Sequence, residues 1–372
     1  MTTVRDITSR IEQFAPKNLA EEWDPIGLSF GSFDNKVNKV LVALDFDKNT
    51  LKEAKEKDVD LIFTHHPAIF SALKTLNSHD SRRSEYLELI RSDIALYSAH
   101  TNIDSAENGM NDWLAKAIDL KEPYDILETG YQSELKLLAL YTPLEDAERM
   151  RDVLHSVGAG QVGNYSNVSY TATGMGRFKP ESNASPTIGE EGKTEEVKEE
   201  RVEMLFPPHL LGRILEAIYK NHPYEEPVYH ILDIGKKDKD YGLGRLGEFE
   251  DAITLEEAII KVKKAFNLEK VRSANIELDH KIKKVAILGG SGEKYYKQAL
   301  SKQADLYVTG DISYHGAQDM IRDGLPFIDA GHFIENIFTE KMTEILNQWN
   351  KEEEWNVEFI PATSQEDVFK FN

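Results

Sequence analysis

The feature that most constrains the fold is a regular alternation of short apolar strands and helices in the two outer segments of the chain. The predicted strands are KVLVALDF (39–46), DLIFTHH (60–66), the start of IALYSAHTNID (94–104), KKVAILGG (283–290), DLYVTGD (305–311), PFIDAG (326–331) and the closing WNVEFIPA. Short, nearly continuous apolar strands separated by helices are typical of parallel βαβ units. The outer segments therefore predict an α/β core domain with a mostly parallel sheet.

The middle of the chain has a different order of elements. Its predicted strands cover 135–143, 164–174, 195–207 and 227–234. Two helical patterns lie between them, which gives the order βαββαβ of ferredoxin-like domains. We therefore predict that residues 1–129 and 241–372 form one split core domain. Residues 130–240 are predicted to form an inserted ferredoxin-like α+β domain.

Composition excludes several classes of protein. The formal net charge of the 372 residues is −21, so the chain lacks the basic surface that direct nucleic-acid binding requires. It contains no cysteine, which excludes disulfides and thiolate metal sites and fits a cytoplasmic protein. The N-terminal residues carry no secretory signal, and no stretch approaches the roughly 20 apolar residues of a membrane span. We expect no membrane partner.

Histidines gather where the predicted strands of the outer segments end. Five of the 11 histidines lie at or just after such ends: His65, His66, His100, His315 and His332. Carboxylates lie nearby, because Asp104 follows His100 by four residues and Glu335 follows His332 by three. Parallel α/β sheets place their sites at the carboxyl ends of the strands. This pattern predicts a metal site at that edge.

The residue types indicate which ions the site would take. Imidazole and carboxylate ligands without sulfur suit Zn²⁺, Mn²⁺, Fe²⁺ or Ni²⁺ rather than Ca²⁺, which prefers oxygen ligands. The neighbours His65 and His66 are expected to point in opposite directions on an extended segment, so two ions would each take one of them. A carboxylate between two such ions can bridge them.

Each of these features also has an ordinary structural interpretation. A histidine at a strand end can be a hydrogen-bonded structural residue, Asp104 can cap a helix, and Glu335 can be a first-turn carboxylate. The glycine-rich LGGSGE (288–293) can form a tight turn or hold an anion on backbone N–H groups. Trp23, in a loop, can pack internally or stack on a substrate.

A set of motifs in this order resembles a known family. The motifs are WDPIGLSFG (23–31), FTHHP (63–67), HTNIDSAENGMND (100–112), AILGGSG (286–292), VTGD..YH (308–315) and DAGH..E (329–335). They resemble the NGG-interacting-factor-three-like family of dinuclear metal proteins, labelled GTP cyclohydrolase 1 type 2 homologues. The inserted segment, with NHPYEEPVY (221–229) and YGLGRLG (241–247), resembles that of the longer bacterial members, which is similar to the PII/CutA-type fold.

The resemblance implies an assembly and a ligand set. The expected assembly is a toroidal homohexamer, a trimer of dimers with D3 symmetry. Two divalent ions per subunit are expected, with zinc ahead of iron, manganese or nickel. The implied metal ligands are His65, His66, Asp104, His332 and Glu335, of which Glu335 is expected to bridge the ions. His100 and His315 are expected near the metals, where they would shuttle protons or support the ligands.

Two functions are compatible with these features. The first is a metal-dependent hydrolase that uses a metal-activated water on a small-molecule substrate, either a nucleotide or another phosphoester. The chain has no serine or cysteine nucleophile motif that would replace such a water. The second is a non-catalytic, metal-binding regulatory hexamer. Turnover by metal-loaded protein distinguishes the two.

Overall fold

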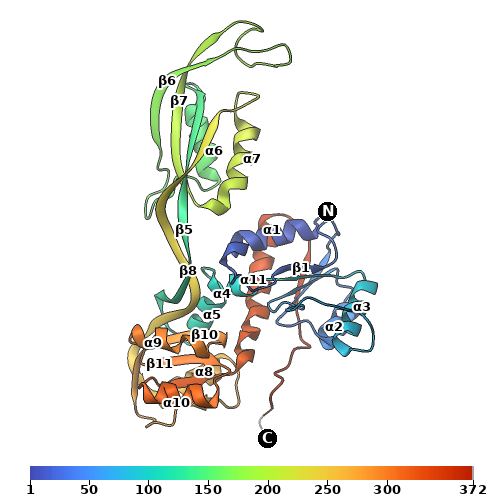
Figure 1. The fold of residues 1–372 in the computed structure, drawn as a ribbon, viewed down its shortest axis with the longest axis vertical. Helices are drawn as coiled ribbons and strands as arrows, with labels where there is room; N and C mark the ends of the chain where they lie inside the picture. Colours follow the sequence, from blue (N-terminus) through green and yellow to red (C-terminus); the bar gives the residue numbers. More distant parts are fainter. Residues whose placement is uncertain (371–372) are drawn as a thin grey trace. The chain divides into compact units, whose positions relative to one another are not determined.

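The computed structural model describes residues 1–370, which divide into two compact units (Figure 1). The first unit combines Met1–Tyr131 with the chain from Tyr241 onward, and the second is Gln132–Asp240. Strands β5 (Lys121–Pro143) and β8 (Tyr229–Thr254) each contribute residues to both units. Within residues 1–370, no helix combines the length and the apolar character needed to cross a membrane.

The first unit contains a five-stranded sheet in the order β1-β4-β3-β2-β13. Its strands are β1 (Gly27–Phe30), β2 (Lys39–Ala43), β3 (Leu61–Thr64), β4 (Ala95–Ser98) and β13 (Glu358–Pro361). Strands β4, β3, β2 and β13 are parallel to one another, whereas β1 runs antiparallel to β4. Both ends of the sequence therefore contribute to this sheet, because β13 pairs with β2.

A second sheet of the first unit continues from β8 in the order β8-β10-β11-β12-β9. The further strands are β9 (Arg272–Ser273), β10 (Lys281–Ser291), β11 (Leu306–Gly310) and β12 (Phe327–Asp329). The pairs β10–β11 and β11–β12 are parallel, but β8 and β9 run antiparallel to their neighbours. The predicted α/β class is confirmed. The core has two mixed sheets, in which antiparallel strands add to the predicted parallel ones.

Helices lie around both sheets of the first unit. They are α1 (Val4–Phe14), α2 (Lys48–Glu56), α3 (Ser81–Arg91), α4 (Thr101–Ser105), α5 (Met110–Ala117), α8 (Leu255–Ala265), α9 (Tyr296–Ser301), α10 (Tyr314–Arg322) and α11 (Ile337–Glu352). Short 3₁₀ turns are η1 (Lys17–Leu19), η3 (Glu293–Tyr295) and η4 (His332–Asn336). The predicted helix from His332 onward thus begins as a 3₁₀ turn.

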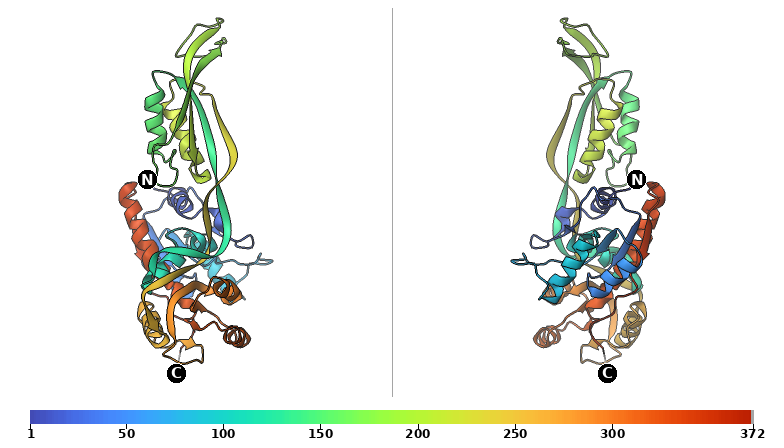
Figure 2. Two further views of the ribbon diagram at one scale, coloured as in Figure 1. Left: turned by 90° about the vertical axis from the view of Figure 1, so that its left-hand side faces the viewer. Right: turned by 90° about the vertical axis from the view of Figure 1, so that its right-hand side faces the viewer.

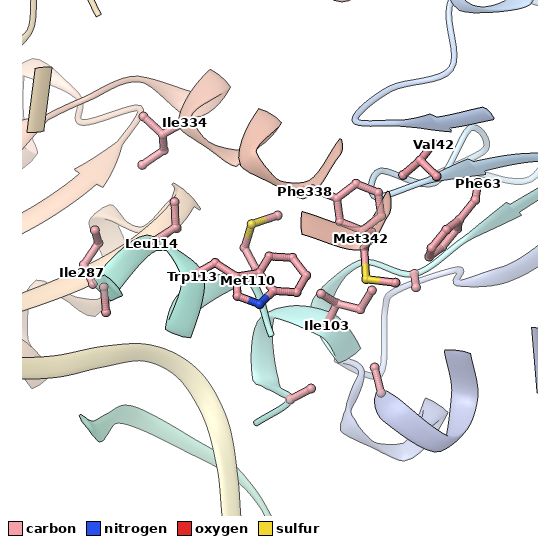
Figure 3. Packing of buried hydrophobic residues seen from close by; sticks show 14 of the residues in the cluster. Val42, Phe63, Ile103, Met110, Trp113, Leu114, Ile287, Ile334, Phe338 and Met342 are labelled. Atoms are coloured by element: carbon pink, nitrogen blue, oxygen red, sulfur yellow. The ribbon is translucent and has the colours of Figure 1, made fainter. Parts of the chain in front are cut away.

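One hydrophobic core joins the two sheets of the first unit (Figure 3). Helices α5 and α11 contribute Met110, Phe338 and Met342, which are all fully buried. Phe63 of β3 and Ile287 of β10 belong to the same cluster and come from different sheets. Close packing in such a core leaves little freedom between the elements it joins. The core therefore holds the carboxyl ends of β3 and β12 in a defined relation.

The second unit has the element order βαββαβ. Its remaining elements are α6 (Ala147–Ser156), β6 (Tyr170–Phe178), β7 (Glu195–Phe206), η2 (Pro208–Leu210) and α7 (Leu211–Asn221). The strand order is β6-β7-β5-β8, and β7 runs antiparallel to both β5 and β6. Helices α6 and α7 cover one face of this sheet (Figures 1 and 2), where Leu140, Met150 and Ile218 are buried in one cluster.

Glu53 on α2 fastens the segment after β13 to the first sheet. Its carboxylate accepts hydrogen bonds from the backbone N–H groups of Thr363 and Ser364 and from Lys57. Burial alone would raise the pKa of Glu53, but these hydrogen bonds lower it from 4.5 to about 2. Because the folded pKa is the lower one, the stabilisation is complete above pH 4.5 and is lost as the pH falls toward 2.

We therefore expect Glu53→Gln to lower the free energy of unfolding by about 1–3 kcal/mol at neutral pH. The difference from the wild type should shrink as the pH falls below 4.5. Urea denaturation followed at several pH values measures it. Glu56→Gln, on the same helix with its side chain 65% exposed, is the control. The prediction would be wrong if the free energies of unfolding of wild type and Glu53→Gln differed by the same amount at every pH.

Candidate metal centre

Three strand ends bring the predicted ligands to one place in the first unit. His65 and His66 follow β3, and His100 follows β4 directly before α4, which carries Asp104. His332 and Glu335 lie in the η4 turn that follows β12 of the second sheet. In a 3₁₀ turn, residues three apart lie on the same side, so His332 and Glu335 face the same cavity.

Side chains from these segments form three groups of candidate ligands. The groups are His65, His66 and His100; His66, His332 and Glu335; and His65, Asp104 and Glu335. Within each group, one potential ligand atom per residue lies within 4.8 Å of the others. Glu335 belongs to two groups that share no other residue. This is the arrangement expected of a carboxylate that bridges two ions.

The group with His65 and Asp104 is deeply buried. His65 Nδ1 lies 3.0 Å from the carbonyl oxygen of Ala99, so the ring donates there and its Nε2 is left as the potential ligand. His65 Nε2 and Asp104 Oδ1 are 3.5 Å apart, and neither has a hydrogen-bond partner among the described residues. Burial lowers the pKa of His65 and, together with the Glu335 charge, raises that of Asp104. Two unpartnered buried ligand atoms fit a cation.

The second group is held by hydrogen bonds around Glu335. Glu335 Oε2 lies 3.0 Å from His66 Nε2 and 3.1 Å from His332 Nε2. Burial alone would raise the pKa of Glu335, but these histidines lower it. Burial would lower the pKa of His66, yet hydrogen bonds with Asp45 and Glu335 raise it to about 10. The hydrogen bond with Glu335 likewise raises the pKa of His332 to about 9. A metal ion here would displace protons from both rings.

Three further carboxylates orient the imidazoles. Asp45 Oδ1 lies 2.9 Å from His66 Nδ1, Asp311 Oδ2 lies 2.6 Å from His332 Nδ1, and Asp24 Oδ1 lies 3.1 Å from His100 Nδ1. Metal-binding histidines commonly donate their other ring N–H in this way. Sequence reasoning missed these roles. Asp45 follows β2 at the same sheet edge. The rule that sites lie at the carboxyl ends of parallel strands identified the histidines, and it would also have identified Asp45.

Two expectations about individual histidines need correction. His65 and His66 do not point apart, because the chain bends at both residues after β3 and their ring centroids lie 5.0 Å from each other. His315 is exposed on α10, where its Nδ1 lies 3.2 Å from Gln318 Oε1, and it does not belong to the described residues that line the cavity. The structure brings His100 to the cavity, but not His315.

All candidate ligands except the fully buried His65 line a cavity of about 530 Å³ that is open to solvent. Trp23 and Phe70 lie at it with their rings stacked at a centroid distance of 6.4 Å, and they are 56% and 52% exposed. Trp23 is therefore not an internal packing residue. Arg82 and Lys294 also line the cavity and add positive charge to an otherwise acidic chain.

The glycine-rich segment lies directly against Glu335. A Cβ atom at Gly289 would lie 2.8 Å from Glu335 Oε1, and one at Gly290 would lie 2.7 Å from it. Gly290 also has a φ of 58°, which larger residues adopt less readily. Strand β10 extends to Ser291, and the helix that follows has only six residues. The glycines therefore admit the carboxylate of Glu335 and do not form an anion site at a helix N-terminus.

Comparisons with known proteins cover the whole chain. A sequence profile of the family described as Duf34/NIF3 (NGG1p interacting factor 3) matches residues 2–367. The "GTP cyclohydrolase 1 type 2 homolog" of Bacillus subtilis (strain 168) is 39% identical over 367 residues, which are 99% of this chain and 98% of that protein. A protein of the same name from Staphylococcus aureus (strain N315) is 35% identical over 368 residues, 99% of each chain.

Solved structures are similar over the same length. A crystal structure of a Bacillus cereus protein related to NIF3 is similar with a TM-score of 0.89 at 35% identity, covering 100% of this chain and 99% of that one. The structure of Staphylococcus aureus protein SA1388 is similar with a TM-score of 0.73 at 30% identity, with the same coverage. The fold of this chain is therefore that of proteins related to NIF3.

Proposed function

Because the chain belongs to the Duf34/NIF3 family, we propose that its metal centre holds two divalent ions and hydrolyses a nucleotide or another phosphoester. The observation that carries this proposal is the position of Glu335, which is shared by two separate groups of candidate ligands. His65 and Asp104 would complete one site, and His66 and His332 the other. The imidazole and carboxylate ligands suit zinc first, with iron, manganese and nickel as alternatives.

The bound ions would supply a water of lowered pKa and stabilise negative charge that develops on the substrate. The residues of the chain perform the remaining tasks. His100 faces the cavity from the end of β4, and its hydrogen bond with Asp24 fixes the orientation of the ring. This placement suits proton transfer to or from a substrate.

The walls of the cavity support a nucleotide or a related phosphoester as the substrate. The stacked and exposed rings of Trp23 and Phe70 offer a surface for a planar base. Arg82 and Lys294 line the same cavity. Arg82 Nε donates to the Tyr86 hydroxyl and Lys294 lies over the Tyr295 ring, and their positive charges can meet a phosphate. The size of the cavity, about 530 Å³, is in the usual range for small-molecule sites.

The activity can be tested with metal-loaded protein and a panel of nucleotides and phosphoesters. Once a substrate is found, His100→Gln should lower kcat by about 100-fold, because the variant lacks the titrating imidazole. Its metal content should equal that of the wild type, because neither of the two groups that share Glu335 includes His100. His315→Gln, on the exposed face of α10, is the matched control and should retain full activity.

An absence of turnover by protein with both ions bound would contradict the hydrolase proposal. It would favour the second function, a metal-binding regulatory assembly. If His100→Gln retains full activity, the hydrolase proposal stands, but a group other than His100 transfers the proton.

We further propose that the protein assembles as a D3 homohexamer and that the second unit is a PII/CutA-like module that forms its three-fold contacts. The βαββαβ order of this unit supports the module, and the exposed apolar residues Leu232 and Ile234 of β8 support a contact surface. At a net charge of −21, association needs apolar contacts that outweigh repulsion between copies.

Light scattering should therefore give a mass near six times 42.3 kDa. The double variant Leu232→Asp/Ile234→Asp should give a smaller species, because it places charges in the proposed contact. Ile321→Asp, an exposed position on α10, is the control. A monomeric wild type at micromolar concentration would refute the hexamer, and a hexameric double variant would move the three-fold contact elsewhere.

A further inference from the structure

The second unit has a cavity of its own, with a volume of about 400 Å³. Its walls come from β5, the end of β6, β7, the loop over 180–188 and the connection between α7 and β8. Two hydrogen bonds fasten that loop beside the cavity: Ser185 N–H donates to Glu225, and the Thr187 hydroxyl donates to the carbonyl of Pro223. The cavity is therefore a built feature of this unit.

A buried carboxylate lies in the wall of this cavity. Glu199 on β7 is only 8% exposed. The Tyr224 hydroxyl donates to its Oε1 at 2.8 Å, and no other described residue donates to the Glu199 side chain. The carboxylate lies against Gly176 of β6, where a Cβ atom would be 2.3 Å from Oε2. Glu199 Oε2 has no donor among the described residues and keeps some exposure, so a cation or donor that enters the cavity can meet this largely buried carboxylate.

Aromatic rings make up much of the remaining wall. Tyr141, Phe178 and Tyr224 line the cavity, and the rings of Phe178 and Tyr224 lie 5.8 Å apart at 59°. The faces of aromatic rings attract cations, and their area suits an apolar ligand body. The guanidinium of Arg201 already lies 5.9 Å from the centroid of the Tyr141 ring, so the rings of Phe178 and Tyr224 remain for a bound cation. The wall thus combines one largely buried carboxylate with an apolar, aromatic lining.

The charges around the cavity favour cations over anions. Glu225 and Glu226 join Glu199 in the wall. Arg177 is the only basic side chain among the described lining residues, and it is paired with Glu196. An anionic ligand such as a nucleotide would meet three carboxylates and no free cation there.

We propose that this cavity binds a small organic cation. Its ammonium group pairs with Glu199, and its apolar or aromatic body packs against Tyr141, Phe178 and Tyr224. This site is independent of the hydrolase proposal, since all of its residues lie in the second unit and none is a candidate metal ligand.

Three probes of one shape and different charge test the proposal. Isothermal titration of the full-length protein is carried out with phenethylammonium, 2-phenylethanol and phenylacetate. Phenethylammonium should bind at least about tenfold more tightly than the neutral alcohol. A tenfold difference in affinity corresponds to the usual free energy of a hydrogen bond to a charged group. Phenylacetate should bind more weakly than either. Equal affinities for the amine and the alcohol, or no binding of the amine at millimolar concentration, would overturn the proposal.

Variants then assign the preference to Glu199. Glu199→Gln should remove the tenfold preference for the amine and leave the binding of the alcohol nearly unchanged. Glu216 is an exposed carboxylate on α7 outside the cavity. Glu216→Gln removes the same charge and should leave the affinities for the probes unchanged. Ala184→Trp, on the exposed loop that lines the cavity, should block both probes, and it tests the site even if Glu199→Gln fails to fold. A preference unchanged in Glu199→Gln, or probes that still bind Ala184→Trp, would contradict the assignment.

Discussion

Replacing Glu335 with glutamine should reduce the bound metal from about two ions per chain to less than one. The carboxylate lies in two of the three groups of candidate ligands, and its Oε2 is within 3.1 Å of two imidazole nitrogens. The neutral amide removes the negative charge that would lie between the two ions, so both sites weaken together. Elemental analysis of protein reconstituted with zinc measures the change. Zinc binding should also raise the Tm of the wild type and have little effect on the variant.

Single-site variants separate a shared ligand from a general disturbance of the fold. His65→Ala and His332→Ala should each lose about one ion, since these histidines belong to different groups around Glu335. Glu340→Gln, an exposed carboxylate in the first turn of α11, should retain both ions. Two ions retained in Glu335→Gln would refute the bridging role. One ion in the reconstituted wild type would refute the dinuclear centre.

Replacing Arg245 with methionine should lower the free energy of unfolding of the first unit by about 3–5 kcal/mol. Arg245 is 4% exposed, and its guanidinium donates to both carboxylate oxygens of Asp112. It also donates to the carbonyl oxygens of Ala106, Gly242 and Gly244. Methionine fills most of the volume, but it leaves a largely buried carboxylate and three carbonyl groups without their donors.

Tryptophan fluorescence during urea denaturation isolates this effect. The four tryptophans, Trp23, Trp113, Trp349 and Trp355, all lie in the first unit, so the signal reports that unit alone. Arg322→Met, whose side chain is 72% exposed, is the control and should change the free energy of unfolding by less than about 0.5 kcal/mol.

Adding Asp112→Asn to Arg245→Met should recover part of the lost stability, because it removes the unpaired buried charge. A loss below about 1 kcal/mol in Arg245→Met would show that water replaces the guanidinium at little cost.

Local pattern in the sequence was sufficient to predict most elements and most residues of the candidate metal centre. Apolar runs such as those around Leu61 and Leu306 became buried parallel strands, because only a strand covered on both faces has so continuous an apolar sequence. The absence of cysteine limited the ligands to imidazole and carboxylate. The carboxyl ends of those strands indicated where the ligands would meet.

Only the tertiary structure decided how these residues are arranged around the site. The sequence places Glu335 about 270 positions after His66, yet their side chains lie 3.0 Å apart across two sheets. The bend after β3 brings the rings of His65 and His66 close together, whereas His315 lies exposed on α10. Strand-end position is a local property that the sequence displays. The direction of a side chain and its partners depend on how distant elements pack around a shared core, and no local pattern encodes that packing.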